Sequence, residues 1–503
     1  MSSNDALIAL SSVELRRRIG RKEISPVELM EAVIARIVAL NPVVNAICAT
    51  AFSRARIEAK AAERAVRDGE PLGPLHGLPA GIKDLHDAEG LLTTHGSPLY
   101  RDHVAAKDCA MVANVRRAGA IVVAKTNVPE FGAGANTRNP VWGTTGNPFD
   151  TRLNAGGSSG GSAVALACDM LPVCTGSDTG GSLRIPAAYC GVVGMRPSPG
   201  LVPMEFRPLG WTPISVLGPM GRTVADTRLL FAAQIGMSDA EPLAFALDPE
   251  LVAAGRPADL GRLRVAWTED FGQCPVSREI RALMRQRIAA LRHLFRACDE
   301  VTFDFGEADR AFDVIRALGF VARYRAAYSK DPSSLGQSVR ANYEMGASLS
   351  LGDAAWAHAE QTRIFRRFQA TFRDYDLVLS PTTPVSPRPW TELYLAEREG
   401  KILRNYYHWL ALTYFVTLTT NPAVSLPCGR DQAGLPFGLQ VTGRFRGDLA
   451  LLSAAEAMEE AFAGIGLGRP RPDPVKLASM TADLKLPVTH PPTIDAGMMR
   501  TDK

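Results

Sequence analysis

The sequence predicts an α/β protein with a largely parallel or mixed sheet. Between residues 75 and 200, short apolar runs alternate with helical stretches, a pattern typical of buried strands joined by helices. Strands are expected at Leu78 to Ile82, Ala120 to Ala124 and Leu171 to Cys174, with helices near residues 108–118 and 161–169. Strand character returns at Leu377 to Ser380 and Pro436 to Thr442, so C-terminal segments should complete one sheet.

Two helices are expected before this sheet. Ser11 and Ser25 each begin a capping-box pattern with a glutamate three positions later. The second helix should end before Asn41-Pro42, because a proline disfavours helical geometry in the residue that precedes it.

The rest of the chain has two further regions. Residues 235–375 are more helical and more charged, with helices at Arg281 to Ala297 and Ala354 to Phe372, and should form a covering layer or a substrate-shaping insert. The tail after about residue 470 should be extended on the surface. Its prolines are Pro470, Pro472, Pro474, Pro487, Pro491 and Pro492.

The composition of the chain argues against several classes of protein function. The net charge of +4 over 503 residues gives no strong field, so neither nucleic acid nor membrane is expected as a partner. The 8 cysteines form no C-x-x-C pair, which argues against a zinc site and a disulfide scaffold and fits a cytoplasmic protein with reduced thiols. The N-terminus shows no secretory pattern, and no apolar run approaches the ~20 residues of a membrane span.

Two glycine–serine loops are the densest chemical feature: Asn154 to Ser162, and Ser177 to Arg184. Glycines let the backbone approach a substrate carbonyl closely and expose N–H groups to it. A serine becomes a nucleophile only with a base nearby and donors for the developing oxyanion. Either loop by itself also fits a plain tight turn.

Other motifs fit these loops less well. Gly157 to Gly161 matches G-x-S-x-G, which would make Ser159 the nucleophile, but the late histidines, His408 and His490, have no supporting sequence context. A phosphate loop would need Gly-Lys-Ser/Thr after the glycines, and a dinucleotide site would need G-x-G-x-x-G after a strand. The sequence meets neither requirement here.

The base that would activate a serine is best sought among the lysines, since the 8 histidines form no clear triad pattern. Lys83 stands at the end of an otherwise apolar strand. Burial would lower its pKa and supply the neutral amine that a base requires. A salt bridge to Asp84 or another acid is the alternative role for Lys83.

Together these segments closely resemble the amidase signature family of serine hydrolases. The motifs are Gly77 to Asp84 (GLPAGIKD), Gly156 to Ser162 (GGSSGGS) and Asp178 to Ala187 (DTGGSLRIPA), in that order. The resemblance covers residues of about 25–230 and 375–460. It implies the amidase-signature fold, a central mixed β-sheet covered by helices on both faces. One domain is expected over residues 1–503, with a core at about 75–230 and 375–460.

The resemblance also implies roles for individual residues. Ser182 matches the nucleophile, Ser158 the serine that follows a cis peptide bond, and Lys83 the base. The backbone N–H groups of the nucleophile loop would bind the oxyanion, and a glycine loop elsewhere would contact substrate. The oxyanion and substrate residues would be Gly132, Thr179, Gly180, Gly181 and Ser182, and those supporting the triad Ser159, Asp178 and Arg184.

The activity implied is hydrolysis of a small-molecule amide through an acyl-enzyme, without a metal or other cofactor, with esters or carbamates as side substrates. The glutaminase subunit of a tRNA-dependent amidotransferase is the alternative, but Ile185 stands where those subunits usually carry Gln. Thr212 to Leu217 likewise replaces their Ser-Ser-Leu-Asp-Gln run. A non-catalytic binding protein is a third alternative.

Two further expectations concern the oligomeric state and the substrate pocket. The resemblance allows a homodimer. Met204, Phe206 and Trp211 should either line an apolar substrate pocket or pack in the core.

Overall fold

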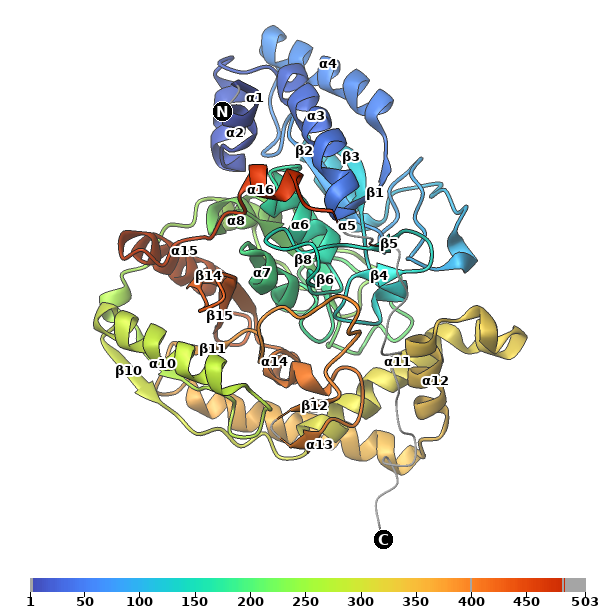
Figure 1. The fold of residues 1–503 in the computed structure, drawn as a ribbon, viewed down its shortest axis with the longest axis vertical. Coiled ribbons are helices and arrows are strands. Elements are labelled where there is room, and N and C mark those ends of the chain that lie inside the picture. The colour runs from blue at the N-terminus through green and yellow to red at the C-terminus, as the bar shows by residue number, and fades with distance from the viewer. Residues whose placement is uncertain (1–2, 399, 482–483, 485–503) are drawn as a thin grey trace.

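The structure, a computed structural model, describes residues 3–398, 400–481 and 484. Over these residues an eleven-stranded mixed sheet forms the centre (Figure 1). In spatial order its strands are β1 (Ile47–Thr50), β3 (Ile121–Thr126), β2 (Pro79–Lys83), β6 (Val173–Asp178), β8 (Val216–Gly221), β7 (Val193–Arg196), β14 (Ala423–Arg430), β15 (Pro436–Thr442), β11 (Leu377–Pro381), β9 (Arg264–Trp267) and β10 (Ala297–Glu300).

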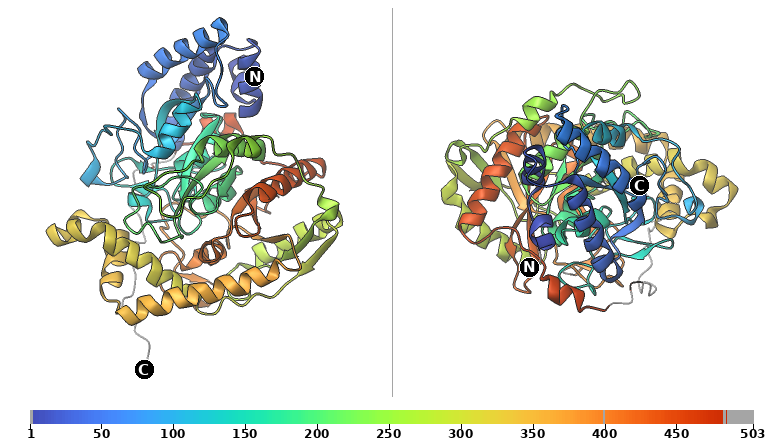
Figure 2. Two further views of the ribbon diagram at one scale, coloured as in Figure 1. Left: turned by 180° about the vertical axis from the view of Figure 1, so that it is seen from behind. Right: turned by 90° about the horizontal axis from the view of Figure 1, so that it is seen from above.

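Helices cover both faces of this sheet, as the sequence predicted. In Figure 1, α6 and α7 lie in front of the sheet. In the view from behind in Figure 2, α8 lies in front of it. The helices are α1 (Ser3–Ile8), α2 (Ser12–Gly20), α3 (Pro26–Val44), α4 (Phe52–Asp68), α5 (Ala110–Arg117), α6 (Gly160–Ala167), α7 (Arg184–Cys190), α8 (Val224–Gln234), α9 (Pro249–Ala253), α10 (Arg278–Leu291), α11 (Ala308–Lys330), α12 (Gln337–Ala347), α13 (Leu351–Thr371), α14 (Ala411–Thr419), α15 (Asp448–Gly464) and α16 (Pro474–Ala478).

The sheet is parallel where it carries the predicted chemistry. Strand β2 pairs in parallel with β3 on one side and with β6 on the other. Carboxyl ends of neighbouring parallel strands meet at one edge of a sheet, so Lys83 and the end of β6 lie close together. The predicted strands in this region are confirmed within a few residues, as are the helices α5 and α6.

Helix α3 differs from the prediction, because it continues through Pro42 to Val44. Pro42 falls in the last turn, where its missing N–H removes only one helical hydrogen bond. The side chain of Asn41 then closes the helix: its Oδ1 accepts the N–H groups of Ala46 at 2.9 Å and Ile47 at 2.8 Å. The predicted stop before Asn41 is therefore wrong by one helical turn.

The predicted helix starts at Ser11 and Ser25 are confirmed. Ser11 accepts the N–H of Glu14, and Ser25 accepts the N–H of Val27. The carboxylate of Glu14 binds Arg17, at 2.7 and 2.6 Å, which completes an exposed ion pair on α2.

The insert at residues 235–375 is less purely helical than predicted. Helix α10 ends at Leu291, and Ala297 begins strand β10 where the sequence had indicated helix. Strand β9 pairs in parallel with β11, so the insert extends the central sheet by two strands. Helices α11, α12 and α13 pack together beyond them, and α13 confirms the second predicted helix.

The tail contains a helix where extended chain was predicted. Asp473 caps α16 by accepting the N–H groups of Val475 and Lys476, and Leu477 is buried. Pro474 occupies the first turn of this helix, where a proline is well tolerated. Pro487, Pro491 and Pro492 lie outside the described residues. None of the described helices is long and apolar enough to cross a membrane.

Replacing Asn41 by alanine should destabilise the protein by about 1–3 kcal/mol, because two buried N–H groups lose their acceptor. A lower melting temperature in scanning calorimetry would show this loss. Val38→Ala is the matched control on the same helix, since Val38 is 62% exposed. An equal effect of both substitutions would contradict a closing role for the Asn41 side chain.

Candidate active site

Lys83 lies at the centre of a cluster of three serine hydroxyls. Its Nζ is 2.8 Å from Ser158 Oγ, 2.8 Å from Ser159 Oγ and 2.9 Å from Ser177 Oγ. Lys83 ends β2, Ser177 lies on the neighbouring strand β6, and the other two serines directly precede α6. Three elements distant in sequence therefore meet at one nitrogen.

The surroundings of Lys83 favour a neutral amine. Its side chain is fully buried, and burial lowers its pKa to about 7 against the opposing attraction of Asp178. A charged lysine has three N–H donors and no acceptor, whereas the neutral amine has two donors and one lone pair. In the neutral state, one of the three hydroxyls can therefore donate its proton to Nζ.

The alternative salt bridge between Lys83 and Asp84 is not formed. The carboxylate of Asp84 instead lies 3.7 Å from the Nζ of Lys125 and accepts hydrogen bonds from Thr94. Within the described residues no carboxylate lies within ion-pair distance of Lys83. Lys83 is thus free of the contact that would fix it in the charged state.

Ser158 follows a cis peptide bond from Gly157, as the resemblance implied. A side chain on Gly157 would place its Cβ 2.9 Å from the backbone of Ala135, so only glycine fits there. Gly132 has a φ of +72°, and its Cα faces Ser158 so closely that an added Cβ would be 3.4 Å from Ser158 Oγ. Both glycines bring backbone close to the serine cluster.

Asp178 organises the loop that carries Ser182. Its carboxylate accepts the N–H groups of Gly181 at 2.8 Å and Leu183 at 3.2 Å. The same carboxylate pairs with Arg184 at 2.9 Å, which is the pair the sequence predicted, and with Arg196 at 3.2 Å. Burial opposes ionisation, but the two guanidinium groups hold the pKa of Asp178 well below its usual range.

The predicted oxyanion donors divide into two groups. The N–H of Gly181 already donates to Asp178, so it is not free for a substrate oxygen. Among the described residues, the N–H groups of Thr179, Gly180 and Ser182 have no acceptor. The N–H of Ser159 donates to the carbonyl of Ser182 at 3.2 Å, which joins the two glycine–serine loops.

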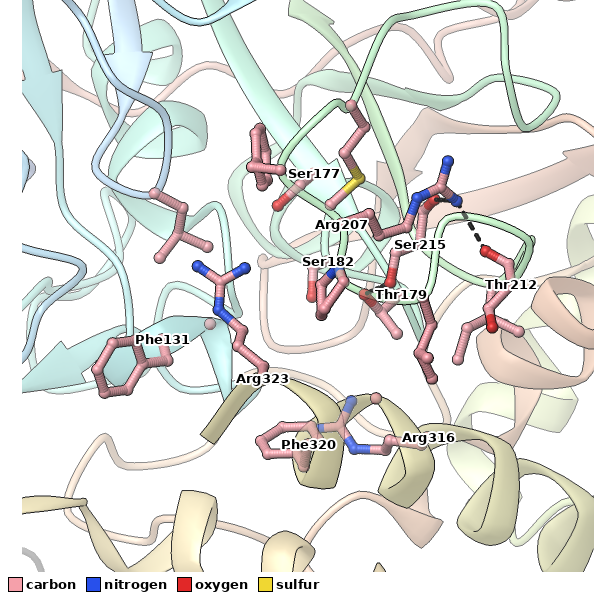
Figure 3. Close-up of a pocket in the computed structure, with 18 of the residues that line it drawn as sticks. Phe131, Ser177, Thr179, Ser182, Arg207, Thr212, Ser215, Arg316, Phe320 and Arg323 are labelled. Carbon is pink, nitrogen blue, oxygen red and sulfur yellow. Dashed lines mark hydrogen bonds between the residues drawn. The ribbon is translucent and has the colours of Figure 1, made fainter. Parts of the chain in front are cut away.

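Ser182 opens into two cavities. The larger has a volume of about 170 Å³ and is drawn in Figure 3. The smaller, about 30 Å³, shares Gly132, Ser182 and Arg316 with the larger one. Its lining includes four aromatic residues: Phe312, Tyr406, Tyr407 and Tyr414.

Two of the three residues predicted for the pocket line the larger cavity. Met204 and Phe206 line the larger cavity. Trp211 does not line it and is 77% exposed, so the prediction that it lines the pocket or packs in the core is wrong. Its loop is held by Arg207, whose guanidinium donates to the carbonyl of Thr212 at 2.7 Å, and this leaves Trp211 facing outward.

The G-x-S-x-G alternative lacks its triad. Ser159 binds Lys83 instead of a histidine. His408 does have an acid partner that its sequence context did not reveal, because its Nε2 lies 2.9 and 3.0 Å from the two carboxylate oxygens of Asp313. That pair joins α11 to the segment before α14 and makes no contact with Ser159. His490 lies outside the described residues.

Several residues around the site carried no readable signal in the sequence. Ser177 stands inside a glycine–serine loop and Arg196 on β7, but only the folded structure shows that they reach Lys83 and Asp178. Arg316 and Arg323 come from the insert helix α11, which no motif marks. No group of three or more metal-ligating side chains occurs among the described residues.

Comparisons with known proteins agree with this geometry. The amidase family model matches residues 28–452. An acylamidase of Rhodococcus erythropolis is 33% identical over 455 residues, which cover 90% of this chain and 95% of that protein. A glutamyl-tRNA(Gln) amidotransferase subunit of Moorella thermoacetica is 34% identical over 480 residues, covering 90% of this chain and 97% of that protein.

Among solved structures, a bacterial aryl acylamidase of the amidase signature family has a TM-score of 0.84 at 28% identity, covering 92% of this chain and 99% of that one. The fold and these matches define a hydrolase that acts on carbon–nitrogen bonds of small-molecule amides other than peptide bonds. The chain belongs to the amidase family, in its amidase-signature group.

Replacing Asp178 by asparagine should lower the free energy of unfolding by about 3–5 kcal/mol, because Arg184 and Arg196 would remain buried without their counter-charge. Chemical denaturation measures the change. Asp150→Asn is the matched control, since its partner Arg152 is largely exposed and such a pair contributes about 0–1 kcal/mol. Equal losses in the two variants would contradict the organising role of Asp178.

Proposed function

We propose that the protein is a free-standing serine amidase in which Ser182 is the nucleophile, Ser158 the proton relay and Lys83 the base. The observation that carries the proposal is the buried Lys83 amine, bound to Ser158 and without a carboxylate partner among the described residues. Ser182 lines both cavities, and Ser158 and Ser177 line the larger one with it. No cofactor is needed for this chemistry.

In the first step, Ser182 Oγ bonds to the amide carbon. Its proton passes to Ser158 Oγ while the proton of Ser158 passes to the neutral Lys83 Nζ. The negative charge that develops on the substrate oxygen is stabilised by N–H groups of the nucleophile loop. Thr179, Gly180 and Ser182 are the donors in this proposal, because Asp178 occupies the N–H of Gly181.

In the second step, the carbon–nitrogen bond breaks and the leaving nitrogen takes a proton back through Ser158 from Lys83. Water then attacks the acyl carbon and gives a proton to the same relay. The bond between that carbon and Ser182 Oγ breaks, the relay returns the proton to Ser182 Oγ, and the acid leaves as carboxylate. Ser159 and Ser177 hold Lys83 in place throughout, since each accepts a hydrogen bond from Nζ. The net reaction converts amide and water into carboxylate and ammonia or amine.

Several finer features belong to the same proposal. The apolar residues that line the larger cavity and the similarity to an acylamidase and an aryl acylamidase support an acyl or aryl amide as substrate. Esters and carbamates would react by the same steps. We place the enzyme in the cytoplasm as a single-domain protein. It is a homodimer in this proposal, and light scattering tests that oligomeric state.

A role as a glutaminase subunit is the alternative, and it has relatives of similar identity, such as the amidotransferase protein from Moorella thermoacetica. Ile185 argues against it, because this apolar side chain follows Arg184 and lines the smaller cavity beside Ser182. A glutaminase needs polar partners for the amine and carboxylate of glutamine. Glutamine hydrolysis that outpaces hydrolysis of aryl amides would favour the alternative.

Replacing Lys83 or Ser182 by alanine should lower kcat/KM for amide hydrolysis by at least about 10³-fold, because each removes a member of the relay. Labelling by a fluorophosphonate, followed by mass spectrometry, should locate the probe on Ser182 and fail in Ser182→Ala. Lys107→Ala is the control, since Lys107 is exposed and lines neither cavity. Rates like wild type in either variant would overturn the mechanism, and no labelling of wild type would favour a non-catalytic protein.

The rate should depend on pH through Lys83. Burial lowers the pKa of Lys83 to about 7, so the amine is neutral above that pH and protonated below it. We expect kcat/KM to be level above about pH 8 and to fall about tenfold per pH unit below pH 6. A flat profile from about pH 5 to pH 9, with chemistry limiting, would contradict a lysine base.

A further inference from the structure

The larger cavity carries an unusual balance of charge. Among the described residues that line it there is no aspartate or glutamate, whereas three arginines do so: Arg207, Arg316 and Arg323. A cavity with apolar walls and one sign of charge attracts ligands of the opposite sign. The three arginines differ in whether their charge is available to a ligand.

Arg207 is already neutralised. Its Nη2 lies 2.5 Å from both carboxylate oxygens of Glu241, and its Nη1 donates to two carbonyl groups of its own loop. Glu241 and Arg207 are both largely buried. This arginine fixes the loop at residues 204–215 and leaves no charge for a ligand.

Arg316 is held by neutral groups. Its Nε donates to Asn342 at 3.1 Å and its Nη2 to the hydroxyl of Tyr406 at 2.7 Å. Phe320 and Tyr407 lie against its guanidinium, 4.9 and 4.8 Å from its central carbon. The side chain is nearly buried, so its charge contributes to the potential of both cavities while its position is fixed.

Arg323 is the available cation. It lies seven residues after Arg316 on α11, about two helical turns further along the same face. It forms no ion pair with an acid among the described residues, and the ring of Tyr324 is its neighbour at 5.9 Å. Figure 3 shows its guanidinium extending from α11 toward the side of the cavity where Ser182 lies.

The histidines of the cavity do not change this balance. Burial first, and then the charge of Arg323, lowers the pKa of His95 to about 3. His86 is likewise held neutral, since burial and the nearby lysines lower its pKa well below the usual range. At neutral pH both rings are uncharged. The carboxylate of Asp313 lies within electrostatic reach of Arg316, so Arg323 is the lining arginine whose charge has no acidic partner among the described residues.

We propose that Arg323, supported by the fixed charge of Arg316, is an anionic subsite that binds a carboxylate of the substrate remote from the amide under attack. This inference rests on the proposed function and adds the substrate class: amides that carry a carboxylate on an apolar or aryl spacer. Phe131, Phe206 and Phe320 provide the wall along which such a spacer would lie. A guanidinium suits this task because it binds a carboxylate through two parallel hydrogen bonds.

The test compares pairs of amides that differ only in a terminal carboxylate or its methyl ester. One series places this group on the acyl side and the other on an anilide ring, so that the two series show which half of the substrate reaches Arg323. We expect wild type to prefer the carboxylate in one series by about tenfold in kcat/KM, equal to about 1.4 kcal/mol. Arg323→Gln should remove that preference and leave the rate on the ester within about twofold.

Arg325→Gln is the matched control, since Arg325 is an exposed arginine on the same helix that does not line the cavity. It should keep the preference of wild type. Equal rates on carboxylate and ester in both series, or a preference that survives in Arg323→Gln, would overturn the anionic subsite.

A second readout separates this proposal from the mechanism. Two aryl fluorophosphonates, one with a carboxylate and one with its methyl ester, should label Ser182 at different rates in wild type and at equal rates in Arg323→Gln. Equal labelling by both probes in wild type would contradict the anionic subsite alone. Absence of labelling by either probe would contradict the proposed nucleophile, and with it the subsite that depends on it.

Discussion

The burial of one lysine without an acidic partner is the constraint on which the site depends. Two buried lysines lie on neighbouring strands, one register position apart: Lys83, which ends β2, pairs with Thr126 of β3, and Lys125 pairs with Ile82. Lys125 pairs with the carboxylate of Asp84, the residue that follows Lys83, and is further fixed by Thr93. Lys83 is left with serine hydroxyls alone, which satisfy its hydrogen bonds whether it is charged or neutral.

The charge of Asp178 must be diverted for this to work, because an unpaired carboxylate near Lys83 would hold the amine protonated. Arg184 and Arg196 take up that charge, and Arg184 also binds Gln440 at 2.6 Å and the carbonyl of Thr413 at 2.9 Å. Gln440 lies on strand β15 and Thr413 on helix α14, both in the C-terminal part of the chain. The same buried pair therefore shapes the nucleophile loop, lowers the influence of Asp178 on Lys83 and ties the two halves of the chain together.

The strands and loops at this edge of the sheet could be predicted from the sequence, whereas several residues that surround the site could not. Glycine-rich loops and a lone charge on an apolar strand drew attention to Lys83, Ser158 and Ser182, but their roles came from the resemblance to the amidase signature family. Ser177 could not be found in this way, since its contact with Lys83 depends on which strand lies beside β2. The course of α3 through Pro42 was missed because Pro42 removes only one hydrogen bond in the last turn and the side chain of Asn41 binds the N–H groups just beyond the helix end. Strands β9 and β10 were missed because four-residue strands among long helices leave little periodicity.

The residues that could be predicted from the sequence and those that could not differ in their chemical role. The groups that would break the amide stand on β2, β6 and the start of α6, in the buried core, where small changes of distance would disturb proton transfer. The wall opposite them comes from α11, a helix of the insert that packs on other helices and contributes no group to the cluster around Lys83. Substitutions along α11 can thus change the charge and shape of the cavity without moving Lys83 or Asp178. A fold arranged in this way keeps one reaction and allows its substrates to differ.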